Sequence, residues 1–98
     1  MIAHIVLFKF KRGIQKSDPR VARILEDMQG LPAKIDLIRG WEHGFNVTAD
    51  ALAWDYVLRA TFDCVGDMHT YFSHPDHAVV LEQWEEISDY AYCDLPLP

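Results

Sequence analysis

The first strand predicted from the sequence is apolar on both of its faces. Residues 2–11, IAHIVLFKFK, are rich in β-branched and aromatic residues, a composition typical of a strand. Two sets of side chains alternate along the segment, namely His4, Val6, Phe8 and Phe10 on one face and Ile5, Leu7 and Lys9 on the other. Because both sets are largely apolar, we expect protein to cover this strand on both sides.

The remaining elements complete a β-α-β-β-α-β order. Asp18 and Pro19 supply an N-cap and a first-turn proline for a helix that we expect to end near Gly30. The later elements are predicted as a long strand over 35–47, a strand over 54–62, a short helix over 65–73, a helix over 75–87 and a strand over 89–95. The order predicts one α+β domain over residues 1–98, a ferredoxin-like fold with a four-stranded antiparallel sheet whose second helical region is broken at Pro75.

Such a fold carries its helices on one face of the sheet and leaves the other face open. The open face is predicted to carry Ile5, Leu7, Ile38 and Val57, an apolar patch too large for a stable monomer to expose. The simplest cover is the same face of a second chain. We therefore expect a homodimer whose two sheets pack face to face.

Composition excludes several kinds of partner. The net charge is −6, and all but one of the Lys and Arg residues lie within residues 1–39, whereas residues 60–98 contain acidic residues and no basic ones. This distribution argues against nucleic acid as a partner and suggests that the two halves face each other, within one chain or across a dimer. No apolar run approaches the roughly 20 residues that cross a membrane.

The first residues and the cysteines indicate the compartment. In the opening segment the charges follow the apolar run, the reverse of a signal peptide, so we expect a cytoplasmic protein. Cys64 and Cys93 form no CxxC pair and are predicted to be small buried hydrophobic residues. No spacing typical of a zinc or iron–sulfur site is present.

The segment YFSHPDH, residues 71–77, carries the most chemistry. His74 precedes a proline and is predicted to cap the helix break, whereas Tyr71 and His77 flank that break. An imidazole suits a general base, and an aspartate such as Asp94 could orient His77. A structural alternative makes Tyr71 an aromatic anchor and His77 a half-buried, hydrogen-bonded residue. The spacing of His74 and His77 does not complete a metal motif.

Together these segments resemble the stress-responsive A/B barrel proteins, also called dimeric α/β barrel (Dabb) domains. The matching features, in chain order, are HIVLFKFK, the LP at the end of the first helix, GWEHGFN, DYVLRATF, YFSHPDH and the closing Asp94. The resemblance implies that two chains form a dimeric α+β barrel. A plant polyketide cyclase of the family performs an aldol condensation without a cofactor, using a tyrosine and a histidine that match Tyr71 and His77. A pocket histidine of the family matches His4.

The resemblance leads to one leading hypothesis and two alternatives. The leading hypothesis is cofactor-free acid/base chemistry, like that of a cyclase or lyase, on a small apolar carbonyl compound, with no metal. His77 would abstract a proton, and Tyr71 or His4 would stabilise the oxyanion. Asp94 would be the fourth catalytic residue. The residues expected to bind the ligand are Val6, Phe8, Leu25, Met28, Val80 and Trp84. The alternatives are a non-catalytic stress or ligand-binding dimer and a monooxygenase of the related ferredoxin-like barrels, some of which need haem.

Overall fold

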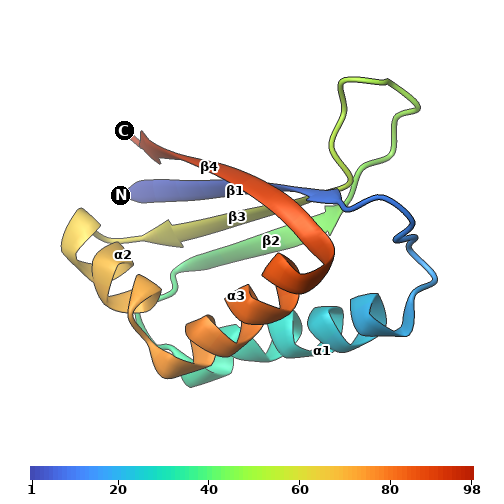
Figure 1. The fold of residues 1–98 in the computed structure, drawn as a ribbon. Coiled ribbons are helices and arrows are strands. Elements are labelled where there is room, and N and C mark those ends of the chain that lie inside the picture. The colour runs from blue at the N-terminus through green and yellow to red at the C-terminus, as the bar shows by residue number, and fades with distance from the viewer.

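All three helices lie on one face of a four-stranded antiparallel sheet (Figure 1). The computed structural model describes residues 1–98 as β1 (Ile2–Phe10), α1 (Pro19–Lys34), β2 (Gly40–Phe45), β3 (Tyr56–Phe62), α2 (Val65–Phe72), α3 (Pro75–Ile87) and β4 (Ser88–Pro96). The strand order is β2-β3-β1-β4, so β1 lies between β3 and β4. The predicted ferredoxin-like fold with a broken second helical region is confirmed.

Helix α1 is longer than predicted. The Asp18 side chain caps its first turn by accepting the Arg20 backbone N–H at 2.9 Å, as expected. The helix then continues to Lys34 instead of ending near Gly30. Pro32 cannot donate to the carbonyl of Met28, four residues earlier, and the indole Nε1 of Trp41 donates to that carbonyl at 3.0 Å instead. A donor from β2 therefore compensates for the proline inside the last turn.

The second strand begins later than predicted. Residues 35–39 precede β2, and Ile35 and Ile38 pack against the core there. Ile38 therefore does not lie on the open face, contrary to prediction. The strand starts at Gly40, where a Cβ would lie 2.2 Å from Thr61 Oγ1. Only glycine permits this close approach of β2 to β3.

The register of β1 decides which residues share a face. His4 pairs with Ala60 of β3 and with Asp94 of β4. Because side chains alternate, the side of the sheet that faces the helices carries the following residues: His4, Val6 and Phe8 from β1, Trp41, His43 and Phe45 from β2, Tyr56, Leu58, Ala60 and Phe62 from β3, and Tyr90, Tyr92 and Asp94 from β4. This face and the helices enclose the core.

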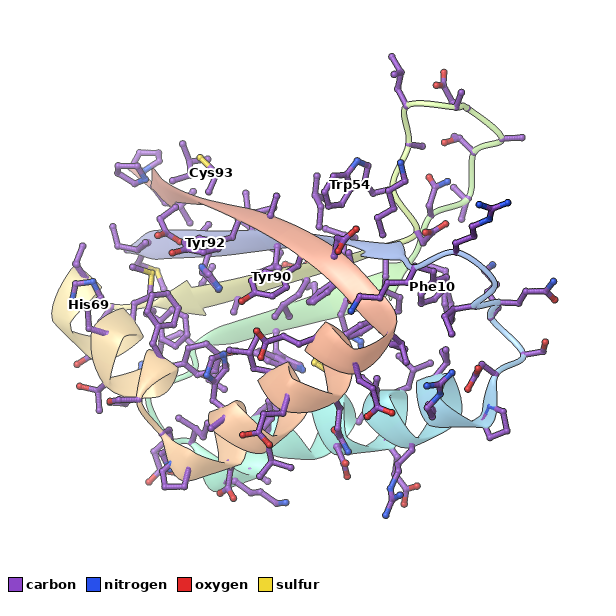
Figure 2. The ribbon with its side chains drawn as sticks, in the orientation of Figure 1. Phe10, Trp54, His69, Tyr90, Tyr92 and Cys93 are labelled. Atoms are coloured by element: carbon purple, nitrogen blue, oxygen red, sulfur yellow. The ribbon has the colours of Figure 1, made fainter.

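The other face of the sheet is open. By the same register, its apolar side chains include Ile5, Leu7, Val57, Ala91, Cys93 and Leu95. The loop between β2 and β3 rises away from the helices on this side, and Figure 2 shows Trp54 and Cys93 on the side of the sheet opposite the helices. Both cysteines are exposed, so the prediction that they are buried was wrong. Cys93 lies on an edge strand that no second sheet covers, and Cys64 precedes α2.

The basic and acidic parts of the chain meet at α3. Arg20 contacts Glu86 at 3.4 Å, and Lys11 Nζ donates to the backbone carbonyl of Glu85 at 2.8 Å. Some of the basic residues in the first part of the chain are therefore paired with the acidic part of the same chain. These pairs are exposed and contribute little stability. No helix is both long and apolar enough to span a lipid bilayer.

Truncating the core should unfold the domain more easily than truncating its surface. Phe62 is fully buried, so Phe62→Ala is expected to lower the free energy of unfolding by about 3–5 kcal/mol. Val79 is exposed on α3, so Val79→Ala serves as the matched control, with a change within about 0.5 kcal/mol. Urea unfolding of the three proteins measures both values, and equal stability of the two variants would contradict the assigned core.

Candidate functional site

A cavity of about 210 Å³ lies between the sheet and the helices. Its walls come from β1, β3, β4 and all three helices. The residues that line it are His4, Val6, Phe8, Met28, Leu58, Tyr71, Phe72, His77, Val80, Leu81, Trp84, Tyr90 and Tyr92. The wall is therefore mainly apolar and aromatic, with a few polar groups, the composition typical of small-molecule sites.

Most residues predicted for the site line this cavity, and two do not. Leu25 packs against the core but is not part of the lining. Asp94 is not part of the lining either, but its carboxylate contacts His4. Sequence reasoning missed five lining residues, namely Leu58, Phe72, Leu81, Tyr90 and Tyr92. The alternation along β4 carried a signal for two of them, because Tyr90 and Tyr92 share a face with Asp94.

His4 is held by a carboxylate. Its Nδ1 donates to Asp94 Oδ1 at 2.6 Å, a short, charge-assisted contact between directly paired strands. The His4 side chain is 6% exposed and that of Asp94 is 30% exposed. Asp94 therefore orients His4 and not His77, contrary to the expectation from the sequence. The contact fixes the imidazole and leaves Nε2 as the nitrogen available to a ligand.

His77 is held by the helix break. Its Nδ1 donates to the Phe72 carbonyl at 3.1 Å, which leaves the lone pair of Nε2 without a protein partner in the neutral ring. Burial lowers the pKa of His77, the Phe72 carbonyl opposes this shift, and the imidazoles of His4 and His74 lower the pKa further. His77 is therefore a neutral hydrogen-bond acceptor at neutral pH.

Tyr71 lies between the two histidines. Its ring centroid is 4.4 Å from that of His77 and 6.3 Å from that of His4. Burial raises its pKa, so the hydroxyl keeps its proton at neutral pH. No hydrogen bond to a protein group engages this hydroxyl. Tyr71 is thus a donor available to a ligand.

Trp84 forms an aromatic wall of the cavity. Its ring stacks on Phe8 with centroids 4.0 Å apart and planes inclined by 20°. The indole Nε1 is enclosed and has no hydrogen-bond partner. An enclosed donor without an acceptor costs about 1–3 kcal/mol, and such groups are uncommon in folded proteins. The indole of Trp41, by contrast, is satisfied by the Met28 carbonyl.

Two further histidines have other surroundings. His74 caps α3 by accepting the Asp76 backbone N–H at Nδ1, 3.1 Å away, which confirms its predicted role at the break. His43 is hydrogen bonded to the Tyr56 hydroxyl, and it lies outside the cavity lining. Burial lowers the pKa of His43 and raises the pKa of Tyr56 to about 12. No three side chains of the metal-binding types come together in this structure.

Comparison with known proteins shows both a family and a fold. The family model of the Stress Responsive A/B Barrel Domain matches residues 2–94. An uncharacterized protein of Streptomyces coelicolor is 30% identical over 94 residues, which cover 96% of this chain and 97% of that protein.

Solved structures that share the fold include the following three. A dimeric ferredoxin-like protein of unknown function from Bacteroides fragilis is 29% identical, with a TM-score of 0.83 over 98% of this chain and 95% of that one. A dimeric ferredoxin-like protein of unknown function from Thermobifida fusca is 24% identical, with a TM-score of 0.86 over 98% and 90% of the two chains. A hydroxynitrile lyase from Passiflora edulis is 17% identical, with a TM-score of 0.84 over 99% and 93%.

The lowered pKa of His77 predicts a stability that falls with acid. Above the ordinary pKa of 6.5 neither the folded nor the unfolded chain protonates this residue, so it contributes no pH dependence there. Below 6.5 the unfolded chain binds a proton that the folded chain resists, and the free energy of unfolding decreases until the pH reaches the lowered pKa. Urea unfolding between about pH 7 and pH 5 should show a shallower decrease for His77→Gln than for the wild type. Parallel curves would contradict the burial of this imidazole. A residual slope is expected because the pKa of His43 is also lowered.

Proposed function

The chain belongs to the stress-responsive A/B barrel family, and on that premise we propose that it is a homodimer that binds a small carbonyl compound in the cavity and moves a proton on it without a cofactor. One observation carries the proposal. Three polar side chains with free hydrogen-bonding capacity, His4, Tyr71 and His77, meet in the wall of a cavity that is otherwise mainly apolar. This arrangement suits acid/base chemistry on an apolar compound with one reactive oxygen.

His77 is the proposed base. It is neutral at neutral pH because burial lowers its pKa, and its Nδ1 is committed to the Phe72 carbonyl. Its Nε2 can therefore take a proton from the carbon next to the carbonyl group of the bound compound. The electrons of the broken C–H bond move to the carbonyl oxygen, which becomes an enolate oxygen.

Tyr71 and His4 are the proposed stabilisers of that oxygen. The Tyr71 hydroxyl retains its proton and has no protein acceptor, so it can donate to the developing negative charge. His4, oriented by Asp94, donates from Nε2 when the ring is protonated. The enolate can then attack a second carbonyl carbon, as in a cyclase; the C=O π bond of that carbon opens, and the resulting alkoxide takes the proton from His77. The same sequence in reverse breaks a carbon–carbon bond, as in a lyase.

The lyase version is supported by a neighbour with the same fold. The Passiflora edulis protein is a hydroxynitrile lyase, and the likeness at 17% identity extends to the fold alone. A fold of this kind therefore accommodates an enzyme that breaks a bond, and the substrate must be argued from this chain's own cavity.

A non-catalytic binding protein is the second candidate. The observation that favours it is that the nitrogen of His77 nearest the helix break is already satisfied by a backbone carbonyl, as in a structural histidine. In this alternative the cavity would hold a ligand without chemical change. Proton exchange, tested below, separates the two candidates.

A second copy of the chain is the proposed cover of the open sheet face. Leu7 and Val57 at its centre are 41% and 37% exposed, respectively, and Ile5 lies beside them. Val47 and Leu52 on the loop above this face are 95% and 89% exposed. Apolar groups this exposed are typical of an interface. The relatives from Bacteroides fragilis and Thermobifida fusca are described as dimeric, which supports a dimer here.

We also propose a cytoplasmic location. Both cysteines are free thiols in this structure. Exposed free thiols persist in a reducing compartment and are oxidised outside it.

Proton abstraction can be tested without knowing the natural substrate. Small ketones, both acyclic and aromatic, are incubated with the protein in D2O, and loss of the proton signal next to the carbonyl is followed by ¹H NMR. The wild type should accelerate the exchange for at least one ketone. His77→Gln should reduce the acceleration by about 10²-fold or more, because a positioned base contributes at least that factor. Tyr71→Phe should reduce it about 10²- to 10³-fold by removing one donor to the oxyanion.

The matched control for the exchange assay is His69→Gln. His69 is an exposed imidazole on α2 and does not line the cavity, so this variant should exchange ketone protons at the wild-type rate. Catalysed exchange that survives loss of His77 would remove its role as base. Binding of ketones without any exchange would favour the non-catalytic candidate.

The proposed dimer predicts a charge-sensitive interface. Leu7→Glu places a charge at the centre of the open face and should convert the dimer to a monomer, as measured by light scattering after size-exclusion chromatography. Val79→Glu adds the same charge on the helical side of the molecule and should leave the dimer intact. A wild-type protein that is monomeric at about 100 µM would refute the proposed assembly.

A further inference from the structure

We propose that the ligand of the cavity is an uncharged aldehyde or methyl ketone, a compound with its carbonyl group at one end and a short hydrocarbon chain at the other. The carbonyl group lies beside His4, Tyr71 and His77. The chain extends from there toward Phe8 and Trp84. The inference rests on the proposed function, because it takes the carbonyl oxygen to be the group that Tyr71 and His4 bind, and it adds the position of that group in the ligand, the polarity of the remainder and its length.

The cavity has a polar end and an apolar end, because two of its walls run in the same direction. Strand β1 contributes His4 and Phe8, which are four residues and about 13 Å apart along the strand. Helix α3 contributes His77 and Trp84, which are seven residues and about 10 Å apart along the helix. The rings of Phe8 and Trp84 stack with centroids 4.0 Å apart, and Tyr71 lies between the two histidines. The three polar groups therefore share one end of the cavity, and the stacked pair shares the other.

Away from the polar end, the cavity offers no partner to a second polar group. The buried lining residues there are Val6, Phe8, Met28, Leu58, Val80 and Trp84. The one side-chain N–H among them, that of Trp84, is enclosed. No Lys or Arg side chain lines the cavity. A carboxylate, a phosphate or a second carbonyl oxygen would be buried here without a donor, which is strongly unfavourable, so this part of the ligand is a hydrocarbon.

Two tyrosines of β4 form the exposed side of the cavity. Tyr90 and Tyr92 are 36% and 58% exposed (Figure 2). They pair with Phe8 and Val6, respectively, so they flank the path of the proposed chain. Their hydroxyl groups can remain in water while their ring faces contact the ligand. A chain that enters from this side is therefore covered by apolar ring surface once it is bound.

The stacked pair of Phe8 and Trp84 closes the apolar end and limits the length of the chain. The ring of Tyr56 packs against both, with centroids 6.2 and 5.2 Å away, and does not line the cavity. A dry apolar cavity of about 150 Å³ holds benzene, which has six non-hydrogen atoms. In the same proportion, the cavity of about 210 Å³ holds about eight non-hydrogen atoms. The methyl ketone of this size is 2-heptanone.

Two isomeric ketones test the position of the carbonyl group. 2-Heptanone carries it near one end, and 4-heptanone, with the same formula, carries it at the centre. With its oxygen at the polar end, 4-heptanone extends two fewer carbon atoms toward Phe8 and Trp84. 2-Heptanone should therefore bind about tenfold more tightly, since each buried CH2 group contributes a factor of about four. Dissociation constants come from chemical-shift titration of the ¹⁵N-labelled wild-type protein.

A third compound tests the polarity of the chain. 6-Oxoheptanoate has a carboxylate in place of the last methyl group of 2-heptanone. It should bind at least about tenfold more weakly than 2-heptanone, because the apolar end holds no cation and no free donor.

Contacts between the bound ketone and the protein test its direction. Isotope-filtered NOE spectra of 2-heptanone with the ¹³C,¹⁵N-labelled protein separate the two methyl groups of the ligand. The methyl group at the end of the chain should contact ring protons of Phe8 or Trp84. The methyl group next to the carbonyl should contact ring protons of Tyr71 or His77. The reverse pattern would contradict the proposed orientation.

A series of methyl ketones from 2-butanone to 2-nonanone tests the closed end. The affinity should rise about fourfold with each CH2 group up to about 2-heptanone and then stop rising, because the chain has reached Phe8 and Trp84. Phe8→Leu makes this wall smaller and should move the limit to a longer ketone. Phe10→Leu, on the same strand and outside the lining, should leave the limit unchanged. The wild-type titrations and NOE contacts decide the question even if Phe8→Leu folds poorly.

Four results would overturn the inference. They are the absence of measurable binding of 2-heptanone, equal affinity for the two heptanones, equal affinity for 6-oxoheptanoate, and an affinity that rises without a break to 2-nonanone.

Failure of this inference differs from failure of the proposed function. If 2-heptanone binds with the expected contacts and the protein does not accelerate exchange of its protons, the ligand class is right and the proposed chemistry is wrong. If another ketone exchanges its protons in a way that depends on His77, while 2-heptanone binds no better than 4-heptanone, the ligand class is wrong and the acid/base proposal stands.

Discussion

The pairing of β1 with β4 on one side and β3 on the other is the constraint on which the site depends. It places His4 directly opposite Asp94, with both side chains on the face that the helices cover. A slip of one residue would turn every side chain of β1 to the other face and would break the contact between the imidazole and the carboxylate. The same register aligns Val6 and Phe8 as the floor of the cavity. Strand pairing therefore specifies the polar site and the apolar walls together.

The helix break contributes the second half of the site for a related reason. Helix α2 ends at Phe72, and the carbonyls of a last turn have no donors within their own helix. Pro75 starts a new helix because it needs no hydrogen bond at its nitrogen. Two residues later, still in the first turn of α3, His77 donates back to the Phe72 carbonyl. The helix break thus exposes a backbone acceptor and also positions the imidazole, so no additional structural element is needed to hold it.

Burial then gives the two sides of the site different chemistry. His77 has a lowered pKa and Tyr71 a raised pKa, and in both cases the main cause is removal of the charged form from water. Both groups are therefore neutral at neutral pH, one as an acceptor and the other as a donor. His4 differs because its Nδ1 donates to the carboxylate oxygen Oδ1 of Asp94 at 2.6 Å. A pair of groups in contrasting surroundings is the usual basis for dividing acid and base roles within one pocket.

The sequence predicted the fold well because its signals are local and repeated. Alternation in β1 and β3, the Asp18-Pro19 cap and the break at Pro75 each follow from neighbouring residues. Predictions failed where a distant residue decides the outcome. Helix α1 passes Pro32 because Trp41, nine positions further along, donates to the carbonyl that Pro32 leaves free. Asp94 pairs with His4 and not with His77 because the strand order β3-β1-β4 brings the two ends of the chain together.

The proposed dimer and the cavity meet on β4. The side chains along this edge strand alternate between the two faces of the sheet. Tyr90, Tyr92 and Asp94 are directed to the helical side, and Ala91 and Cys93 are directed to the open face. Within one chain β4 is paired along one edge only and is largely exposed. A second sheet packed on Ala91 and Cys93 would restrict the motion of the strand that carries Asp94. Because His4 takes its orientation from Asp94, the proposed assembly of two chains would be coupled through this single strand to the order of the polar site, although the open face and the cavity lie on opposite faces of the sheet.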